Sequence, residues 1–272
     1  SPMPRGRRRT VQGRGVQPLS TGTMNLSAMP SNQVVRVDAR TGITYDVGTL
    51  RTSAWVSQGR SPVSFEQTTA SEQPLYQATG FGASMPGVLF DGSDDILWNA
   101  FSAQSSQTIS MVAGLRYTGG ASNYHQGSIG GSAVASSENE SDNYYNGFGI
   151  RPTSPAGHAD GFTIYQGPTA GSGYNYRSSQ TGGVASSVLS LGASWTYVGG
   201  TNVVLLSRTG STAGTSATSN DFDLPDTFES MSLGKYSYGV LEGQLSEAHT
   251  WDRALRQEEL NRATRVIRGR QQ

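Results

Sequence analysis

The chain has 272 residues with 20 basic and 20 acidic side chains, so its formal net charge is zero at pH 7. Glycine, serine and threonine together make up more than a third of the residues, which argues against a helical bundle because they weaken helices and suit turns and strands. Cysteine is absent, which excludes disulfides, thiol catalysis and thiolate zinc sites. No apolar run approaches the roughly 20 residues of a membrane-spanning helix, so no membrane partner is expected.

Residues 1–33 are predicted to form an extended basic arm. Prolines and glycines interrupt any helix in this segment, and no hydrophobic periodicity appears. The arm carries five arginines, a residue type suited to bidentate contacts with carboxylates: Arg5, Arg7, Arg8, Arg9 and Arg14. Because such a segment has too little apolar surface to hold itself in place, we expect these arginines to dock on neighbouring subunits. Nucleic acid is not the expected partner, since the arm has no interleaved aromatic residues and the body is not basic.

The body, residues 34–272, is predicted to consist of short strands separated by turns. The clearest strand is residues 108–117, where large apolar side chains recur at every second position. The other predicted strands, in chain order, are residues 34–37, 88–90, 96–98, 162–165, 195–198, 202–206 and 243–251. The second and third of these, and likewise the fifth and sixth, flank a short glycine-containing turn, the pattern of a β-hairpin. Many short strands joined in this way predict an antiparallel β-sandwich.

Two stretches of low complexity interrupt the strands, residues 119–141 and 167–187. They are rich in glycine, serine, asparagine and tyrosine, and we expect them to be loops. Tyrosine among small polar residues is typical of adaptable binding surfaces. In and near these stretches, the candidates for contact with a glycan or with sister subunits are Tyr124, Tyr144, Tyr145, Tyr174 and Tyr176.

One helix is predicted at the C-terminus, where residues 252–255 lead into a helical segment that opens with residues 257–259. Acidic residues lie in its first turn and arginines follow, which is the order that the helix dipole favours. Leu260, Ala263 and Ile267 form one narrow apolar face at helical spacing. We expect this face to pack on the sandwich.

Motifs in both halves of the body resemble the laminin-G-like, concanavalin A-like jelly-roll domains. They are residues 35–39, Trp55, residues 73–76 and residues 88–97 in the front half, and residues 231–234, 241–247 and 251–260 in the back half. The resemblance covers about residues 34–268 and implies a two-sheeted jelly roll that ends in a short helix. Domains of this kind occur in lectins, glycanases, adhesion proteins and structural proteins of tailed bacteriophages, so the fold alone does not specify a function.

Asp91, Asp94 and Asp95 are the weak candidates for a metal site. Carboxylate oxygens in a turn that contains glycine suit calcium, but three carboxylates supply only part of its shell of six to eight oxygens. The alternative is an ordinary Asp-Gly turn whose carboxylates cap backbone amides. We expect the turn without a cofactor, and keep calcium as the second interpretation.

No catalytic constellation is apparent in the sequence. A retaining glycosidase needs two carboxyls about 5–5.5 Å apart, and the closest match, residues 138–142, has no apolar neighbours to form a strand or to raise a pKa. The chain also lacks the glycanase branch's Glu-x-Asp-x-x-Glu set. We expect Glu247 and His249 to have structural roles in the last strand, and the tryptophans to pack in the core. The sequence therefore predicts a protein that is not an enzyme.

The leading prediction is a non-enzymatic viral structural protein, a bacteriophage capsid decoration or cement protein on the capsid surface of the virion. Its arm would bind the major capsid protein or other virion subunits, and the body would form a homo-oligomer, a dimer or trimer. Many modest contacts along one arm would tie several subunits together. The alternative prediction is a carbohydrate-binding, lectin-like adhesin module that binds cell-surface glycans.

Overall fold

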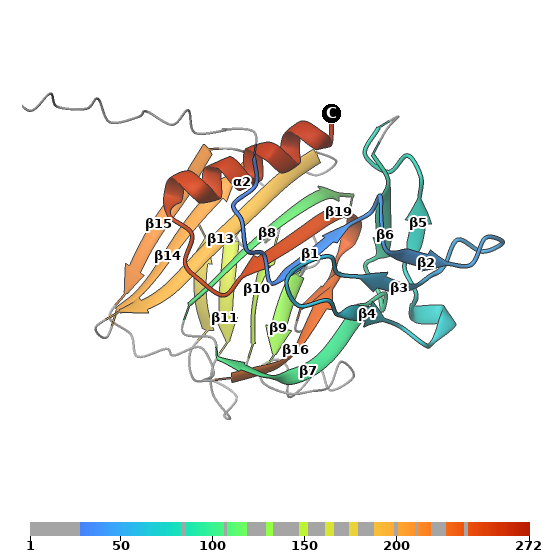
Figure 1. The fold of residues 1–272 in the computed structure, drawn as a ribbon, viewed down its shortest axis with the longest axis horizontal. Helices are drawn as coiled ribbons and strands as arrows, with labels where there is room; N and C mark the ends of the chain where they lie inside the picture. Colours follow the sequence, from blue (N-terminus) through green and yellow to red (C-terminus); the bar gives the residue numbers. More distant parts are fainter. Residues whose placement is uncertain are drawn as a thin grey trace, which may run out of the picture.

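The computed structural model describes residues 28–82, 85–105, 108–118, 129–132, 147–151, 161–165, 174–178, 188–198, 201–209, 211–218, 227–236 and 239–272. Most of this part of the chain is β-strand. The strands form an 8-stranded and a 9-stranded sheet that pack face to face as a sandwich, with a separate 2-stranded ribbon (Figure 1). All the strand pairings are antiparallel. The predicted fold class, an antiparallel sandwich with a short C-terminal helix, is confirmed.

The 8-stranded sheet runs in the order β15-β14-β13-β8-β19-β6-β5, with β1 paired to β19. Its strands are β1 (Val35–Asp38), β5 (Leu75–Gln77), β6 (Gly87–Asp91), β8 (Thr108–Tyr117), β13 (Val188–Val198), β14 (Thr201–Arg208), β15 (Ser211–Thr218) and β19 (Glu242–Trp251). The 9-stranded sheet runs in the order β12-β11-β10-β9-β16-β7-β4-β3-β2. Its strands are β2 (Ile43–Tyr45), β3 (Thr52–Val56), β4 (Ser64–Glu66), β7 (Leu97–Ser105), β9 (Ile129–Ser132), β10 (Gly147–Arg151), β11 (Gly161–Tyr165), β12 (Tyr174–Ser178) and β16 (Thr227–Leu233). The remaining elements are the ribbon of β17 (Lys235–Tyr236) and β18 (Gly239–Val240), the 3-10 turn η1 (Ala70–Glu72) and the helix α2 (Gln257–Arg270).

The main hydrophobic core lies between the two sheets. Met111 and Trp195 from the 8-stranded sheet pack in the same cluster as Trp55 and Phe65 from the 9-stranded sheet, and all four are buried. The predicted core role is thus confirmed for these two tryptophans. Burial of side chains this large is the dominant stabilising contribution in a sandwich, at roughly 1.5–3 kcal/mol for each fully buried one.

A second core forms where α2 lies along the outer face of the 8-stranded sheet (Figure 1). The predicted helix face of Leu260, Ala263 and Ile267 packs here against Val112 and Trp251, as expected. The helix begins at Gln257, with the predicted acids in its first turn, and Glu259 accepts a hydrogen bond from the backbone N–H of Arg256 at 3.0 Å. In the described part of the chain, no helix is long and apolar enough to cross a membrane.

Both faces of β8 are buried because the helix covers one and the opposite sheet covers the other. Close approach of the helix depends on small residues in the strands beneath it. A Cβ on Gly114 would lie 2.5 Å from Ile267 Cγ2, and one on Gly192 would lie 2.9 Å from Leu260 Cδ1. The side chains of β8 therefore point alternately into two interiors, one between the two sheets and one between the 8-stranded sheet and α2.

One of the two predicted hairpins is wrong. The strand at 195–198 does pair with that at 202–206, as β13 and β14. In contrast, β6 pairs with β5 and β19 in one sheet, while β7 pairs with β4 and β16 in the other. The turn at residues 92–96 thus crosses from one sheet to the other, because both flanking runs are buried core strands that face each other across the sandwich.

The stretches of low complexity are not loops throughout. β9 lies within the first and β12 within the second, and both extend the 9-stranded sheet through backbone pairing. Backbone hydrogen bonds do not require large side chains, so these strands carry little hydrophobic signal in the sequence.

Residues 28–33, the last part of the predicted arm, contact the sandwich. Met29 packs against the second core, and the indole N–H of Trp251 donates to the backbone carbonyl of Ser31 at 3.1 Å. The backbone N–H of Arg60 donates to the carbonyl of Gln33. The five arm arginines lie outside the described residues, so the arm stays a prediction.

Candidate functional site

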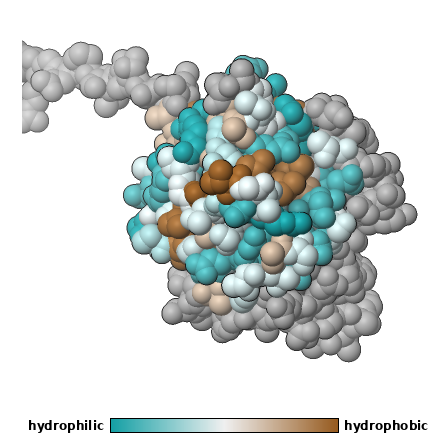
Figure 2. Space-filling model, turned by 90° about the vertical axis from the view of Figure 1, so that its right-hand side faces the viewer, coloured by the Kyte–Doolittle hydropathy of each residue, from teal (hydrophilic) through white to brown (hydrophobic). Residues whose placement is uncertain are grey.

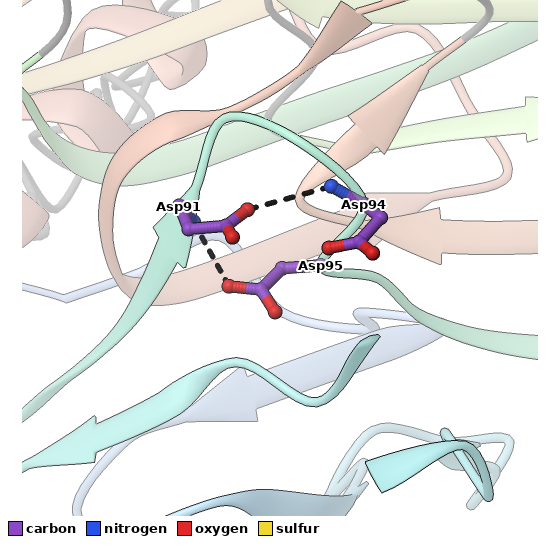
Figure 3. Close-up of side chains that lie close together, drawn as sticks. All are labelled: Asp91, Asp94 and Asp95. Carbon is purple, nitrogen blue, oxygen red and sulfur yellow. Dashed lines mark hydrogen bonds between the residues drawn. The ribbon is translucent and has the colours of Figure 1, made fainter. Parts of the chain in front are cut away.

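Three carboxylates meet in the turn between β6 and β7, which we call the aspartate turn (Asp91, Asp94 and Asp95). One oxygen atom from each lies within 4.8 Å of the others (Figure 3). Asp91 Oδ1 accepts hydrogen bonds from the backbone N–H of Ser93 at 2.8 Å and of Asp94 at 3.4 Å. Asp95 Oδ2 accepts one from the backbone N–H of Asp91 at 2.9 Å. Two of the three carboxylates therefore hold the turn in shape.

Asp95 is the most unusual of these groups because it is only 4% exposed. Burial, followed by the neighbouring charge of Asp91, raises the pKa of Asp95 from 3.8 to about 6. The hydrogen bond from the Asp91 amide and the charge of Arg51 act in the opposite direction but do not outweigh burial. The Asp95 carboxyl therefore keeps its proton to a higher pH than an ordinary aspartate does and carries a buried charge above about pH 6.

Gly92 sets the path of the aspartate turn. Its φ is +81°, a conformation that favours glycine, and a Cβ there would lie 2.7 Å from Glu242 Cβ on β19. The backbone hydrogen bonds to the carboxylates account for the conformation as an Asp-Gly turn. Calcium binding by the same oxygens stays a prediction.

A second group of interest is exposed at the end of the sandwich formed by β2, β3 and β5. The rings of Tyr45 on β2 and Tyr76 on β5 stack with centroids 4.4 Å apart and planes 17° apart. Tyr45 is 36% exposed and Leu50, in the turn between β2 and β3, is 44% exposed. We call these three residues the tyrosine platform, and Figure 2 shows hydrophobic surface on this end of the molecule.

The tyrosine platform joins the edges of the two sheets. The backbone N–H of Tyr76 donates to the carbonyl of Leu50 at 2.8 Å, and that of Thr52 donates to the carbonyl of Pro74 at 2.7 Å. The stack therefore lies where the 9-stranded sheet meets β5 of the 8-stranded sheet, and backbone pairing on both sides holds the two rings in contact.

A third group is fully buried under the C-terminal end of α2. Glu247 and His249 on β19 are 0% exposed, with His249 Nε2 and Glu247 Oε2 2.9 Å apart. Arg270 NH1 donates to the same carboxylate oxygen at 2.7 Å. The predicted structural roles of Glu247 and His249 are confirmed: both side chains are buried and, with the partly exposed Arg270, they tie the helix to the last strand.

The structure places few of the predicted contact residues. Tyr174 and Tyr176 lie on β12, at the outer end of the 9-stranded sheet. The tyrosines at 124, 144 and 145 lie outside the described residues, as do the acidic stretch at 138–142 and all five arm arginines. Of the predicted site residues, the structure brings together only the aspartate turn.

The sequence-based predictions missed the tyrosine platform. The signal used there was tyrosine within a stretch of small polar residues, whereas Tyr45 and Tyr76 lie in short strands far apart in the chain. Tyr76 belongs to a motif that resembles the jelly-roll family, but its stacking partner is set by tertiary pairing of β2 with β3 and of β5 with β6. The only local signal is Tyr45 itself, next to a turn of polar and glycine residues.

No known family model matches the chain, and no curated protein matches it. Several solved structures share its fold. Domain 4 of AbnA, a GH43 extracellular arabinanase from Geobacillus stearothermophilus solved with arabinotriose, is 11% identical with a TM-score of 0.58, and the match covers 86% of this chain and 98% of that one. An arabinofuranosidase complexed with arabinofuranosyl-α-1,2-xylobiose is 13% identical with a TM-score of 0.56, covering 89% of this chain and 60% of that one.

A sialidase from Trypanosoma rangeli in complex with sialic acid is 10% identical with a TM-score of 0.51; the match covers 88% of this chain but only 33% of the sialidase. Because these three structures share only 10–13% of their residues with this chain, the matches show a common fold and no more. They confirm the resemblance to jelly-roll domains as far as the β-sandwich, and they show no link to a virus. The chain is thus similar, over most of its length, to β-sandwich domains of proteins that act on or bind carbohydrates.

Proposed function

We propose that the chain is a carbohydrate-binding module that binds glycans without cleaving them. One observation carries the proposal: the match spans 98% of a single domain, and that domain was solved with arabinotriose. The match to domain 4 therefore concerns a whole domain and not a fragment of a larger enzyme. A carbohydrate-binding module was the alternative prediction from the sequence. The structural neighbours support it better than they support the leading prediction, a capsid decoration protein.

Binding without cleavage is supported by the state of the acidic residues in the described part of the chain. The carboxylates of the aspartate turn are close together, but Asp95 is buried and Asp91 is engaged with backbone amides. Glu247 is buried and paired with Arg270. A glycosidase needs two carboxyls that both reach the scissile bond, which these pairs do not provide.

One experiment tests both parts of this proposal. The full chain is incubated with insoluble arabinan and xylan, and the protein left in solution and the soluble sugars released are measured in the same tubes. We expect the protein to be depleted from solution by at least one of these neutral polysaccharides with no sugar released. Release of shorter sugars would contradict the non-enzymatic part, and no depletion on either would count against the binding of neutral glycans.

We propose the capsid decoration role as a second function, compatible with glycan binding. The feature that favours it is the arginine-rich arm, whose final residues are anchored on the sandwich through Met29 and Ser31. An arm fixed at its base can carry five guanidinium groups to carboxylates on a neighbouring virion subunit. In this proposal the body is displayed on the capsid surface and the arm supplies the attachment.

A further inference from the structure

We propose that the tyrosine platform is the site where a neutral sugar ring binds. This inference rests on the proposed function and assigns that function to Tyr45, Tyr76 and Leu50. The platform lies at the end of the sandwich, away from the buried cluster under α2 and on different elements from the tyrosines predicted from sequence. The argument uses the geometry of the rings, the backbone strain beside them and the charge around them.

The ring geometry offers a flat surface for a sugar. Tyr76 covers one face of the Tyr45 ring at 4.4 Å, so the exposed part of Tyr45 is its other face and its edge. Aromatic faces are negative and attract the positive edges of C–H groups, which line one face of a sugar ring. Within the described part of the chain, neither phenolic hydroxyl has a hydrogen-bond partner. No described residue therefore competes with the hydroxyls of a sugar for either phenol.

Leu50 provides an independent observation beside the rings. Its φ is +61°, which is strained for a leucine. Two backbone hydrogen bonds hold it there, from its own N–H to the carbonyl of Asp46 and from the N–H of Tyr76 to its carbonyl. The strain does not serve to bury the side chain, which is 44% exposed. A strained residue with an exposed apolar side chain is typical of a binding site, where it extends the apolar surface of the stack.

The charges around the platform favour a neutral ligand. The nearby cation, Arg51, donates through NH1 to the carbonyl oxygens of Ala70 at 2.6 Å, Gln73 at 3.2 Å and Ser71 at 3.4 Å. The nearby anion, Asp46, is exposed, and its hydrogen bonds from Thr49 hold its pKa below its usual value. The carboxylate of Asp46 and the guanidinium of Arg51 carry opposite charges, so together they give the platform no net charge that would attract an anionic sugar in preference to a neutral one.

The phenol of Tyr76 is also uncharged at neutral pH. Burial, with a smaller effect of Tyr45, raises the pKa of Tyr76 above its usual value. The platform thus combines an aromatic face, an aliphatic edge and hydroxyl groups without net charge. That combination fits the ring of a neutral pentose or hexose.

The test compares binding by the full chain and three variants, using calorimetric titration with arabinotriose and xylobiose as neutral probes and sialyllactose as an anionic probe. Tyr45→Ala should weaken binding of the neutral probe about tenfold, because it removes the ring face. Tyr45→Phe keeps the ring and loses only the hydroxyl, so it should weaken binding less than Tyr45→Ala does. Val56→Ala is the matched control: it trims an exposed apolar side chain of β3 outside the platform and should bind as the wild type does.

Each outcome separates this inference from the proposed function. Wild-type binding of a neutral probe with the same affinity in Tyr45→Ala would overturn the platform and leave the function intact. A wild type that binds sialyllactose but neither neutral probe would overturn the platform alone, and one that binds none of the three probes would overturn the proposed function as well. Tighter binding of sialyllactose than of the neutral probes would overturn the assignment to neutral sugars.

A second measurement on the wild type keeps the test valid if Tyr45→Ala fails to fold. Backbone hydrogen exchange is followed with and without the bound neutral probe. The sugar should slow exchange over residues 44–51 and 75–77. Protection elsewhere with none over these residues would overturn the platform.

Discussion

The carboxyl of Asp95 is a titratable group whose protonation should be visible in the stability of the fold. Its pKa is raised to about 6 in the folded protein, so between about pH 4 and 6 the folded state keeps a proton that the unfolded chain has released. The contribution of the Asp95 carboxyl to the free energy of unfolding therefore falls as the pH rises from about 4 to about 6. Above about pH 6 the stabilisation by the bound proton is lost.

Asp95→Asn should make the protein more stable at pH 7, on the order of 1–2 kcal/mol. The amide oxygen can still accept the bond from Asp91, and the buried charge is gone. Urea unfolding at pH 4 and pH 7 measures the effect, which should vanish at pH 4, where the wild-type carboxyl is protonated.

Calcium reverses the expected sign and so separates the two interpretations of the aspartate turn. A bound cation would stabilise the charged carboxylates, so the wild type would gain stability at pH 7 when calcium is added and Asp95→Asn would lose that gain. A lower stability of Asp95→Asn at pH 7 without added calcium would contradict our account of the bare turn.

Gly234 and Gly269 are a matched pair of glycines with opposite expectations. A Cβ on Gly234 would lie 2.0 Å from the buried ring of Phe90, and its φ is +81°. Gly234→Ala should therefore destabilise the fold by about 3 kcal/mol or more. Gly269 lies in α2 with nothing within 4 Å of its Cβ position, so Gly269→Ala should stabilise by about 0.5–1 kcal/mol. Thermal unfolding of both variants checks this, and a Gly234→Ala protein as stable as the wild type would refute the packing shown around Phe90.

At the scale of elements, the joint between α2 and β19 depends on a buried charge. Glu247 Oε2 is bonded to Arg270 and His249, while its Oε1 has no partner among the described residues. Burial acts to raise the pKa of Asp38, but hydrogen bonds from Arg40 hold it below its usual value, and the charge of Arg270 adds a smaller effect in the same direction. Arg270 is thus a cation that this end of the helix contributes to two buried acids, Glu247 and Asp38.

Arg270→Ala should destabilise the protein by about 2–4 kcal/mol, because it leaves the Glu247 carboxylate buried without its cation. Arg268→Ala, two residues earlier in the same helix, is the control and should change stability by less than about 0.5 kcal/mol. Chemical unfolding measures both. Equal effects of the two substitutions would show that the buried ion pair does not stabilise the joint.

How far the sequence predicts an element depends on whether its signal is local. β8 and the apolar face of α2 could be predicted because their side chains repeat with the period of the element. The false hairpin at β6 and β7 shows the limit. An Asp-Gly turn between two apolar runs has the same local pattern whether the runs pair with each other or face each other across the sandwich, and only the long-range pairing of β6 with β19 decides.

At the scale of the whole molecule, the predicted sandwich and the observed one agree, but the candidate site differs. The aspartate turn could be found in the sequence because its three residues are near neighbours. The tyrosine platform could not, because Tyr45 and Tyr76 belong to different sheets and meet only after both sheets have formed. Sequence patterns thus located the turn within one segment and missed the surface built from two.

Deletion of residues 1–16 should leave the body folded, because the two hydrophobic cores of the sandwich are built from side chains between residues 29 and 267. In the capsid decoration proposal, the same deletion abolishes attachment to particles because it removes all five arm arginines. Thermal unfolding and particle occupancy measure the two effects separately. Unchanged occupancy would contradict the role of the arm without affecting glycan binding by the body.

Glycan binding is the central claim, and a glycan array probed with the full chain tests it most directly. Arrays run with and without a calcium chelator also show whether the aspartate turn contributes. We expect the chain to bind a group of neutral glycans that share one sugar ring, with Tyr45→Ala losing the same group. An array with no bound glycan in either condition would contradict the account.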